Sequence, residues 1–332
     1  MKIAVIGSGG WGTAIAILLA GKGNRVYLWS WQQEETDRLA ADRENKEFLP
    51  GVPFPEGIVC SHSMEECVRD AGLVVCVAPS PATRSTAKAL SAYVAEGQPL
   101  VNLSKGLEEK SLLRLSQVYR QEIPQAKIAV MSGPSHAEEV SRGLPTTNVV
   151  ASDDVEVAHF IQDVFMNQNF RVYTSTDMTG VELGGALKNI IALCAGISDG
   201  LGYGDNTKAA LMTRGLAEIA RLGEAMGARR QTFMGLSGVG DLIVTCTSMH
   251  SRNRRAGILL GQGKSLQETL DEIHMVVEGV NTAAAAYALA QKYQVSMPIT
   301  EQANRILFEG KDAREAVNAL MTRERGMEDL SL

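Results

Sequence analysis

The feature that most constrains the fold is an apolar strand-length run, a glycine turn and an apolar helical pattern at the start of the chain. Residues 2–6 read KIAVI, residues 7–12 read GSGGWG, and residues 13–20 read TAIAILLA. In a dinucleotide-binding βαβ unit, Gly7 would permit the tight turn, Gly9 would let the backbone approach a pyrophosphate, and Gly12 would let the helix pack on the strand. The helix N-terminus would offer free N–H groups to the phosphates. The alternative is a strand, turn and helix that bind nothing, because this glycine pattern alone is weakly specific.

The first half of the chain alternates strand-length apolar runs with amphipathic stretches, which favours a parallel, doubly wound sheet of Rossmann type. The expected strands after the first are 25–29, 73–77, 99–103 and 128–131, with 147–151 and 170–174 as possible extensions, and helical stretches include 81–95 and 108–120. Several strands are followed by small, polar or cationic residues. Ligands of open α/β sheets bind at the carboxyl ends of the strands, so these loops predict a shared anion site.

Beyond about residue 175 the pattern becomes helical. The expected helices lie at 181–197, 207–226, 265–277, 282–293 and 300–309. We therefore expect an α/β protein with a dinucleotide-binding domain at 1–174 and an all-helical substrate-binding and catalytic domain at 175–332. With no low-complexity linker between them, the two should pack directly and leave a cleft.

Composition excludes several classes of function. The formal net charge of −6 argues against a general nucleic-acid binder. No apolar run approaches the roughly 20 residues that span a bilayer, so no transmembrane segment is expected. Five cysteines without C-x-x-C spacing indicate reduced thiols and a cytoplasmic protein. The histidines show no metal-binding spacing, so no catalytic metal is expected.

Lys188 is the strongest catalytic candidate, because it stands with Asn189 in an otherwise almost entirely apolar helical stretch. A buried ammonium needs a partner or gives up its proton, which suits general acid–base catalysis. The alternative is a lysine whose stem lies on the surface with its head in water. Asp241, after the glycine-rich residues 238–240, is a candidate partner that would orient Lys188, and it is equally well explained as a helix cap.

A phosphate grip is predicted at residues 251–253. Ser251 resembles a helix N-cap, Arg252 offers a fork of donors, and Asn253 adds an amide at the same helix start. The alternative is a solvated basic patch, which is the preferred interpretation for Arg254 and Arg255.

Taken together, these segments resemble the NAD(P)-dependent glycerol-3-phosphate dehydrogenases of the bacterial type, from Gly7 to about Glu328. The motifs that carry the resemblance are GSGGWGTA at 7–14, SKGLE at 104–108, SGPSHAEEV at 132–140, ALKN at 186–189, GVGDL at 238–242 and SRNR at 251–254. The resemblance implies reversible conversion of dihydroxyacetone phosphate and sn-glycerol 3-phosphate with NAD(P)H, feeding glycerophospholipid synthesis.

The resemblance also implies roles for individual residues, with Lys188 as the catalytic acid/base. In the mechanism that we expect, Asp241 and Asn189 help to orient Lys188. The implied substrate contacts are Lys105, Gly133, Ser135, Asp241, Ser251, Arg252 and Asn253. The implied cofactor contacts are Gly10, Trp11, Trp31, Lys105, Ala137, Arg252, Val276 and Glu278. By its local sequence alone, Glu278 looks like the end of a helix.

The choice between NAD and NADP stays open. The chain has Gly10 where the family often has serine, and Trp31 where a basic residue or histidine is frequent. The acidic residue that usually follows the second strand and binds a ribose hydroxyl is absent from the end of that strand, and no arginine stands there for a 2′-phosphate.

Two other functions remain open at this point. One is an NAD(P)-dependent 3-hydroxyacid dehydrogenase, whose cleft can also carry a lysine–asparagine pair. The other is a non-catalytic dinucleotide-sensing protein, which would need neither a buried lysine nor a phosphate grip. The largely apolar helical domain predicts a homodimer, and a triose phosphate is the expected small-molecule substrate.

Overall fold

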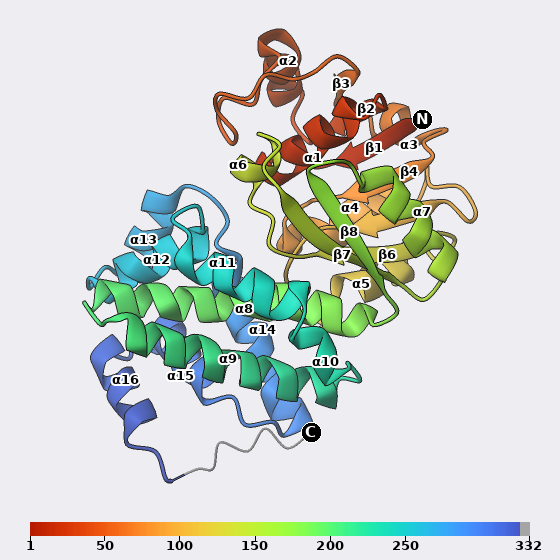
Figure 1. Ribbon diagram of the computed structural model, residues 1–332. Helices are drawn as coiled ribbons and strands as arrows, with labels where there is room; N and C mark the ends of the chain where they lie inside the picture. Colours follow the sequence, from red (N-terminus) through yellow and green to blue (C-terminus); the bar gives the residue numbers. More distant parts are fainter. Residues whose placement is uncertain (326–332) are drawn as a thin grey trace.

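The computed structural model describes residues 1–325, and the last part of the expected second domain, 326–332, lies outside them. An α/β part holds the N-terminus, and a helical part follows it (Figure 1). The strands are β1 (Lys2–Ile6), β2 (Arg25–Trp29), β3 (Ile58–Ser61), β4 (Leu73–Cys76), β5 (Pro99–Asn102), β6 (Lys127–Ser132), β7 (Thr146–Ser152) and β8 (Phe170–Ser175). They form a single sheet in the order β3-β2-β1-β4-β5-β6-β7-β8.

Helices cover this sheet and make up the rest of the described chain. Those of the α/β part are α1 (Gly10–Gly21), α2 (Gln33–Asp42), α3 (Met64–Val68), α4 (Thr83–Leu90), α5 (Leu115–Glu122), α6 (Ala137–Val140) and α7 (Val155–Phe165), with a 3₁₀ turn η1 (Ser80–Ala82). Those of the helical part are α8 (Met178–Gly200), α9 (Asp205–Ala225), α10 (Arg230–Phe233), α11 (Asp241–Thr247), α12 (Arg252–Gly261), α13 (Leu266–Ile273), α14 (Glu278–Tyr293), α15 (Pro298–Phe308) and α16 (Ala313–Met321), with a π-helical turn η2 (Leu236–Gly240).

The Rossmann-type sheet and the helical second part are confirmed, but the sheet is not entirely parallel. β6 and β7 run antiparallel, with Ala129 opposite Ser152. A parallel pair needs a crossover of a dozen or more residues that is usually helical. The only helix between these strands is the four-residue α6, so the chain turns back beside β6.

Several local elements differ from expectation. β3 was not expected, because its short run Ile-Val-Cys-Ser lies among polar residues, and neither were the helices α2 and α3. The helix expected at 108–120 begins only at Leu115. Before it, Leu107 bridges to Arg114 and Leu112 adopts a left-handed φ of 60°, which closes the intervening residues into a loop.

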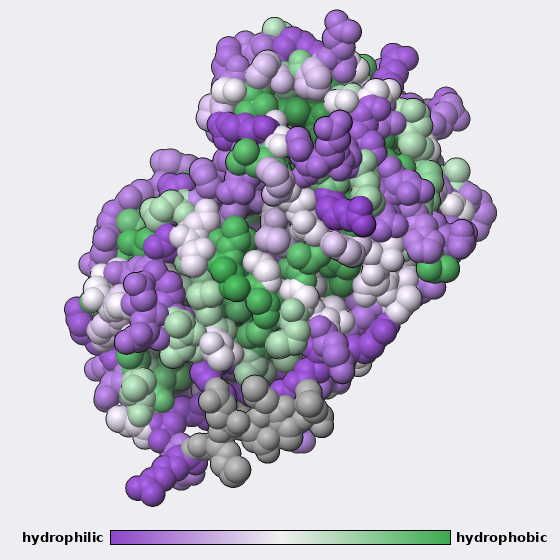
Figure 2. Space-filling view, viewed as in Figure 1, coloured by the Kyte–Doolittle hydropathy of each residue, from purple (hydrophilic) through white to green (hydrophobic). Residues whose placement is uncertain are grey.

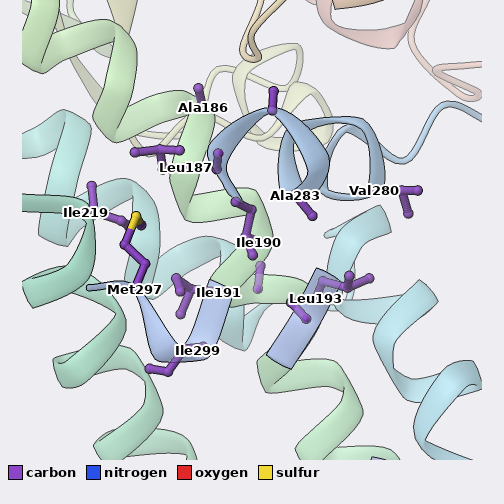
Figure 3. Packing of buried hydrophobic residues seen from close by; sticks show 14 of the residues in the cluster. Ala186, Leu187, Ile190, Ile191, Leu193, Ile219, Val280, Ala283, Met297 and Ile299 are labelled. Atoms are coloured by element: carbon purple, nitrogen blue, oxygen red, sulfur yellow. The ribbon is translucent and has the colours of Figure 1, made fainter. Parts of the chain in front are cut away.

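The helical part is built around α8, which α9, α11, α12 and α14 surround (Figures 1 and 3). Ile190, Ile191 and Leu193 of α8 lie in one buried cluster with side chains of the surrounding helices. The α8–α12 crossing is close, since a Cβ added at Gly196 would lie 2.0 Å from the backbone oxygen of Arg254. This contact places the start of α12 against the helix that carries Lys188.

The helix α8 is longer and more apolar than expected, so the prediction that no apolar run approaches spanning length is wrong. Among the described residues, this 23-residue helix is long and apolar enough, by length and composition, to cross a membrane. Its most apolar window is 89% buried inside the structure, as expected of a core helix. The apolar character of α8 therefore reflects the cluster packed around it.

Candidate active site

Lys188 lies in the middle of α8 and is only 5% exposed. Its ammonium donates hydrogen bonds to the carboxylate of Asp241 and, over 2.7 Å, to Oγ1 of Thr245. Burial lowers the pKa of Lys188 to about 7; Asp241 opposes this shift and the nearby charge of Lys105 adds to it. The side chain can therefore hold or release a proton near neutral pH.

Asp241 joins two lysines from different parts of the chain. It begins α11, directly after the π-helical turn η2, and is 1% exposed. Its second carboxylate oxygen accepts a hydrogen bond of 2.6 Å from Nζ of Lys105, which follows β5, and Ser132 Oγ lies 3.4 Å from the same oxygen. Burial by itself raises the pKa of Asp241, but the ammonium groups of Lys105 and Lys188 hold it below its usual value. Asp241 is thus a partner of both lysines, and it makes no N-cap hydrogen bond to α11.

The side chain of Asn189, which was expected to help orient Lys188, forms its hydrogen bond elsewhere. Its amide oxygen accepts a hydrogen bond of 2.9 Å from Asn253, whose own amide oxygen accepts one of 2.8 Å from the backbone N–H of Gly279. Thr245 is the neighbour of Lys188 that the sequence analysis missed. Its position four residues after Asp241 was the available signal, because such residues share one face of a helix.

The predicted phosphate-binding residues stand at the start of α12. Ser251 caps the helix by accepting a hydrogen bond from the backbone N–H of Arg254 over 3.2 Å, and Arg252 donates to the backbone oxygen of Val276 over 3.0 Å. Arg254 is not solvated, contrary to expectation. Its guanidinium pairs with Asp199 at 2.8 Å, and its side chain is only 14% exposed.

The loop after β6 contributes backbone and hydroxyl groups next to this cluster. Gly133 accepts a hydrogen bond of 3.1 Å from Nζ of Lys105 through its backbone oxygen. The hydroxyl of Ser135 donates to the same oxygen over 3.0 Å. The substrate candidates of this loop therefore lie beside the Lys105–Asp241 pair.

The glycine turn fits a bound dinucleotide. A Cβ at Gly12 would lie 1.9 Å from the backbone oxygen of Gly7, so helix and strand approach as closely as the pattern predicted. A Cβ at Gly9 would meet no atom within 4 Å, which leaves space for a phosphate. At Gly10 a Cβ would lie 2.8 Å from the backbone oxygen of Phe48, which accounts for glycine where the family often has serine.

The other cofactor candidates come from both parts of the chain. Trp31 follows β2 and is 68% exposed, and Val276 is also exposed. Ala137 begins α6, and Trp11 packs in the first turn of α1.

Glu278 was interpreted as the end of a helix, but it is the first residue of α14. It accepts hydrogen bonds from the backbone N–H and the hydroxyl of Ser80, and burial raises its pKa. Glu278 thereby ties the helical part to the loop after β4.

Comparison with known proteins identifies the family. Residues 2–158 match the N-terminal domain, and residues 177–318 the C-terminal domain, of NAD-dependent glycerol-3-phosphate dehydrogenase. The chain belongs to this family. It is an NAD(P)-dependent oxidoreductase that acts on a small molecule.

Curated relatives and a solved structure agree with this assignment. The glycerol-3-phosphate dehydrogenase [NAD(P)+] of Moorella thermoacetica is 58% identical over 98% of this chain and 96% of its own length. That of Fusobacterium nucleatum is 53% identical over 99% and 98%. The crystal structure of the Coxiella burnetii glycerol-3-phosphate dehydrogenase superposes with a TM-score of 0.94 at 40% identity, covering 97% of this chain and 99% of that one.

Proposed function

We propose that this chain reversibly reduces dihydroxyacetone phosphate to sn-glycerol 3-phosphate with NAD(P)H and thereby supplies glycerophospholipid synthesis. The observation that carries the proposal is the cluster of Lys105 with the buried Lys188 and Asp241, beside a helix start with donors for a phosphate. A dinucleotide sensor has no need for an ammonium held in such a cluster.

The bound cofactor would supply the hydride, and the residues at 7–12 would hold its pyrophosphate. Lys188 would supply the proton. In the reduction, the ammonium of Lys188 gives a proton to the oxygen of the substrate carbonyl, which becomes the hydroxyl of the product. In the reverse direction, the neutral amine of Lys188 takes that proton back. Asp241 and Thr245 keep Nζ of Lys188 in place during both steps.

The start of α12 would hold the substrate phosphate. The hydroxyl of Ser251 accepts the capping N–H and keeps its own proton for a ligand. Arg252 donates one N–H to Val276 and keeps other donors of its guanidinium. Asn253 uses both ends of its amide within the protein, so its main role would be to fix α12 against α8 and α14.

We assign residues 1–174 to the dinucleotide-binding domain and residues 175–332 to the helical domain.

We also propose that the protein is a homodimer. Figure 2 shows a band of apolar surface across the helical part, and Met234 and Ile243 are among the exposed apolar side chains. Sedimentation equilibrium would test this, with twice the chain mass of 35.7 kDa as the expected result and the single mass as the contradiction. A cytoplasmic location is proposed because the five cysteines are all unpaired.

The decisive experiment follows the absorbance of NADH and NADPH on addition of dihydroxyacetone phosphate or a panel of keto acids. We expect NADH or NADPH to be oxidised when dihydroxyacetone phosphate is added, and to be oxidised only slowly when the keto acids are added. Faster turnover of a keto acid would favour the hydroxyacid dehydrogenase. Cofactor binding without oxidation by any of these substrates would favour the sensor.

A further inference from the structure

A buried carboxylate that the proposed mechanism does not use lies next to the glycine turn. Glu35, in the first turn of α2, is only 8% exposed. One of its oxygens accepts a hydrogen bond of 2.7 Å from the hydroxyl of Ser8, and the other accepts one of 2.5 Å from the hydroxyl of Ser30. Ser8 belongs to the glycine turn and Ser30 directly follows β2. Glu35 thus stands between the turn and the carboxyl end of β2.

This is where a Rossmann-type site recognises the ribose of the adenosine half. An acidic residue at the end of the second strand usually accepts a hydrogen bond from the ribose 2′-hydroxyl. Here that strand end carries Trp31 and Gln32, and the carboxylate comes from the following helix instead. Among residues 1–325, no lysine, arginine or histidine forms an ion pair with Glu35, so its charge has no cationic partner there.

The hydroxyl of Ser8 adds to the effect of this charge. A serine hydroxyl has one proton, and that of Ser8 points to Glu35. Toward a ligand, the Ser8 oxygen can therefore only accept a hydrogen bond. A ribose hydroxyl can donate such a bond, whereas the oxygens of an ionised phosphate cannot.

We propose that Glu35 sets the cofactor preference, so that the site binds NADH more tightly than NADPH. A 2′-phosphate would bring like charge beside the carboxylate and would find acceptors where it needs donors. This proposal extends the proposed function by naming the preferred cofactor. It rests on one part of that function, namely that this site binds a nicotinamide dinucleotide.

Isothermal titration calorimetry tests the proposal without any turnover. NADH, NADPH, AMP and 2′,5′-ADP (adenosine 2′,5′-bisphosphate) are titrated into the wild-type protein, Glu35→Gln and Glu34→Gln. The wild type should bind NADH and AMP more tightly than their 2′-phosphorylated counterparts. Each pair of ligands gives one ratio, the Kd of the 2′-phosphorylated ligand divided by the Kd of its counterpart. Because Glu35→Gln removes one negative charge at close range, both ratios should fall by about tenfold in this variant. Glu34 is the matched control, because it lies in the same helical turn, carries the same charge and is exposed.

Several results would overturn the proposal. One is a wild type that binds NADPH as tightly as NADH, which needs no variant and so remains decisive if Glu35→Gln does not fold. Another is a folded Glu35→Gln whose ratios are unchanged or move no further than those of Glu34→Gln. Failure of the proposed reaction would look different: the binding ratios would stand, while dihydroxyacetone phosphate would cause no oxidation of either cofactor.

Discussion

Replacing Lys188 by methionine tests the proposed proton transfer directly. The substitution removes the ammonium and keeps a flexible apolar side chain of similar length in a buried site. Asp241 would keep its ion pair of 2.6 Å with Lys105, so the buried carboxylate would not be left unpaired and the variant should fold. Proton transfer by a positioned side chain contributes about 10²- to 10⁴-fold, so kcat should fall by that factor, or roughly 3–5 kcal/mol in the barrier.

The pH dependence gives a second, independent measurement. Reduction of dihydroxyacetone phosphate needs the ammonium form, so its rate in the wild type should fall as the pH rises through the Lys188 pKa of about 7. Oxidation of glycerol 3-phosphate needs the neutral amine and should rise over the same range. Both inflections should disappear from the residual activity of Lys188→Met, measured as the change in NADH absorbance between pH 5 and 9, a window of about two units on each side of that pKa.

A matched control separates this role from a general loss of charge. Lys208 pairs with Asp199 at 2.7 Å, outside the Lys188 cluster, so Lys208→Met should keep most of the turnover. The reasoning would be refuted if folded Lys188→Met kept near-full kcat, or if its residual rate still showed the inflection near pH 7.

Two further predictions concern stability and cofactor binding. Glu218 accepts hydrogen bonds from the first residues of α15, and burial raises its pKa to about 7. The folded state then binds more protons than the unfolded state between pH 4.5 and 7, so this residue should lower the unfolding free energy by up to about 1.4 kcal/mol per pH unit as the pH rises. Urea unfolding at pH 5 and 7.5 should show a weaker pH dependence for Glu218→Gln than for the wild type, with the exposed Glu224→Gln as control, and equal slopes for all three would contradict the assignment. Gly12→Ala would force a Cβ to within 1.9 Å of the Gly7 oxygen, so titration calorimetry should show at least tenfold weaker NADH binding, and wild-type affinity would argue against a tight turn.

Much of the fold and some of the site could be predicted because the signals are local. The apolar run at 2–6 and the glycine turn predicted β1 and the start of α1, and both are present. Lys188 stood out because a cation in an apolar helix needs a partner, and Asp241 was a candidate for that partner. Short elements with weak periodicity, such as β3 and α2, were missed because their local signals are weak.

By itself, the sequence determined where the first strand, the glycine turn and the long helices of the second part lie. It also determined which side chains are able to carry a proton or hold a phosphate, since these features follow from neighbouring residues. The tertiary structure decided which of them meet. Lys188 and Asp241 are 53 residues apart, and they pair only because α11 packs on α8. Thr245, and not Asn189, completes that contact. Likewise, the carboxylate absent from the end of β2 is supplied by Glu35 of α2, because folding places that helix beside the turn. Long-range packing sets such neighbours, and local sequence patterns do not encode it.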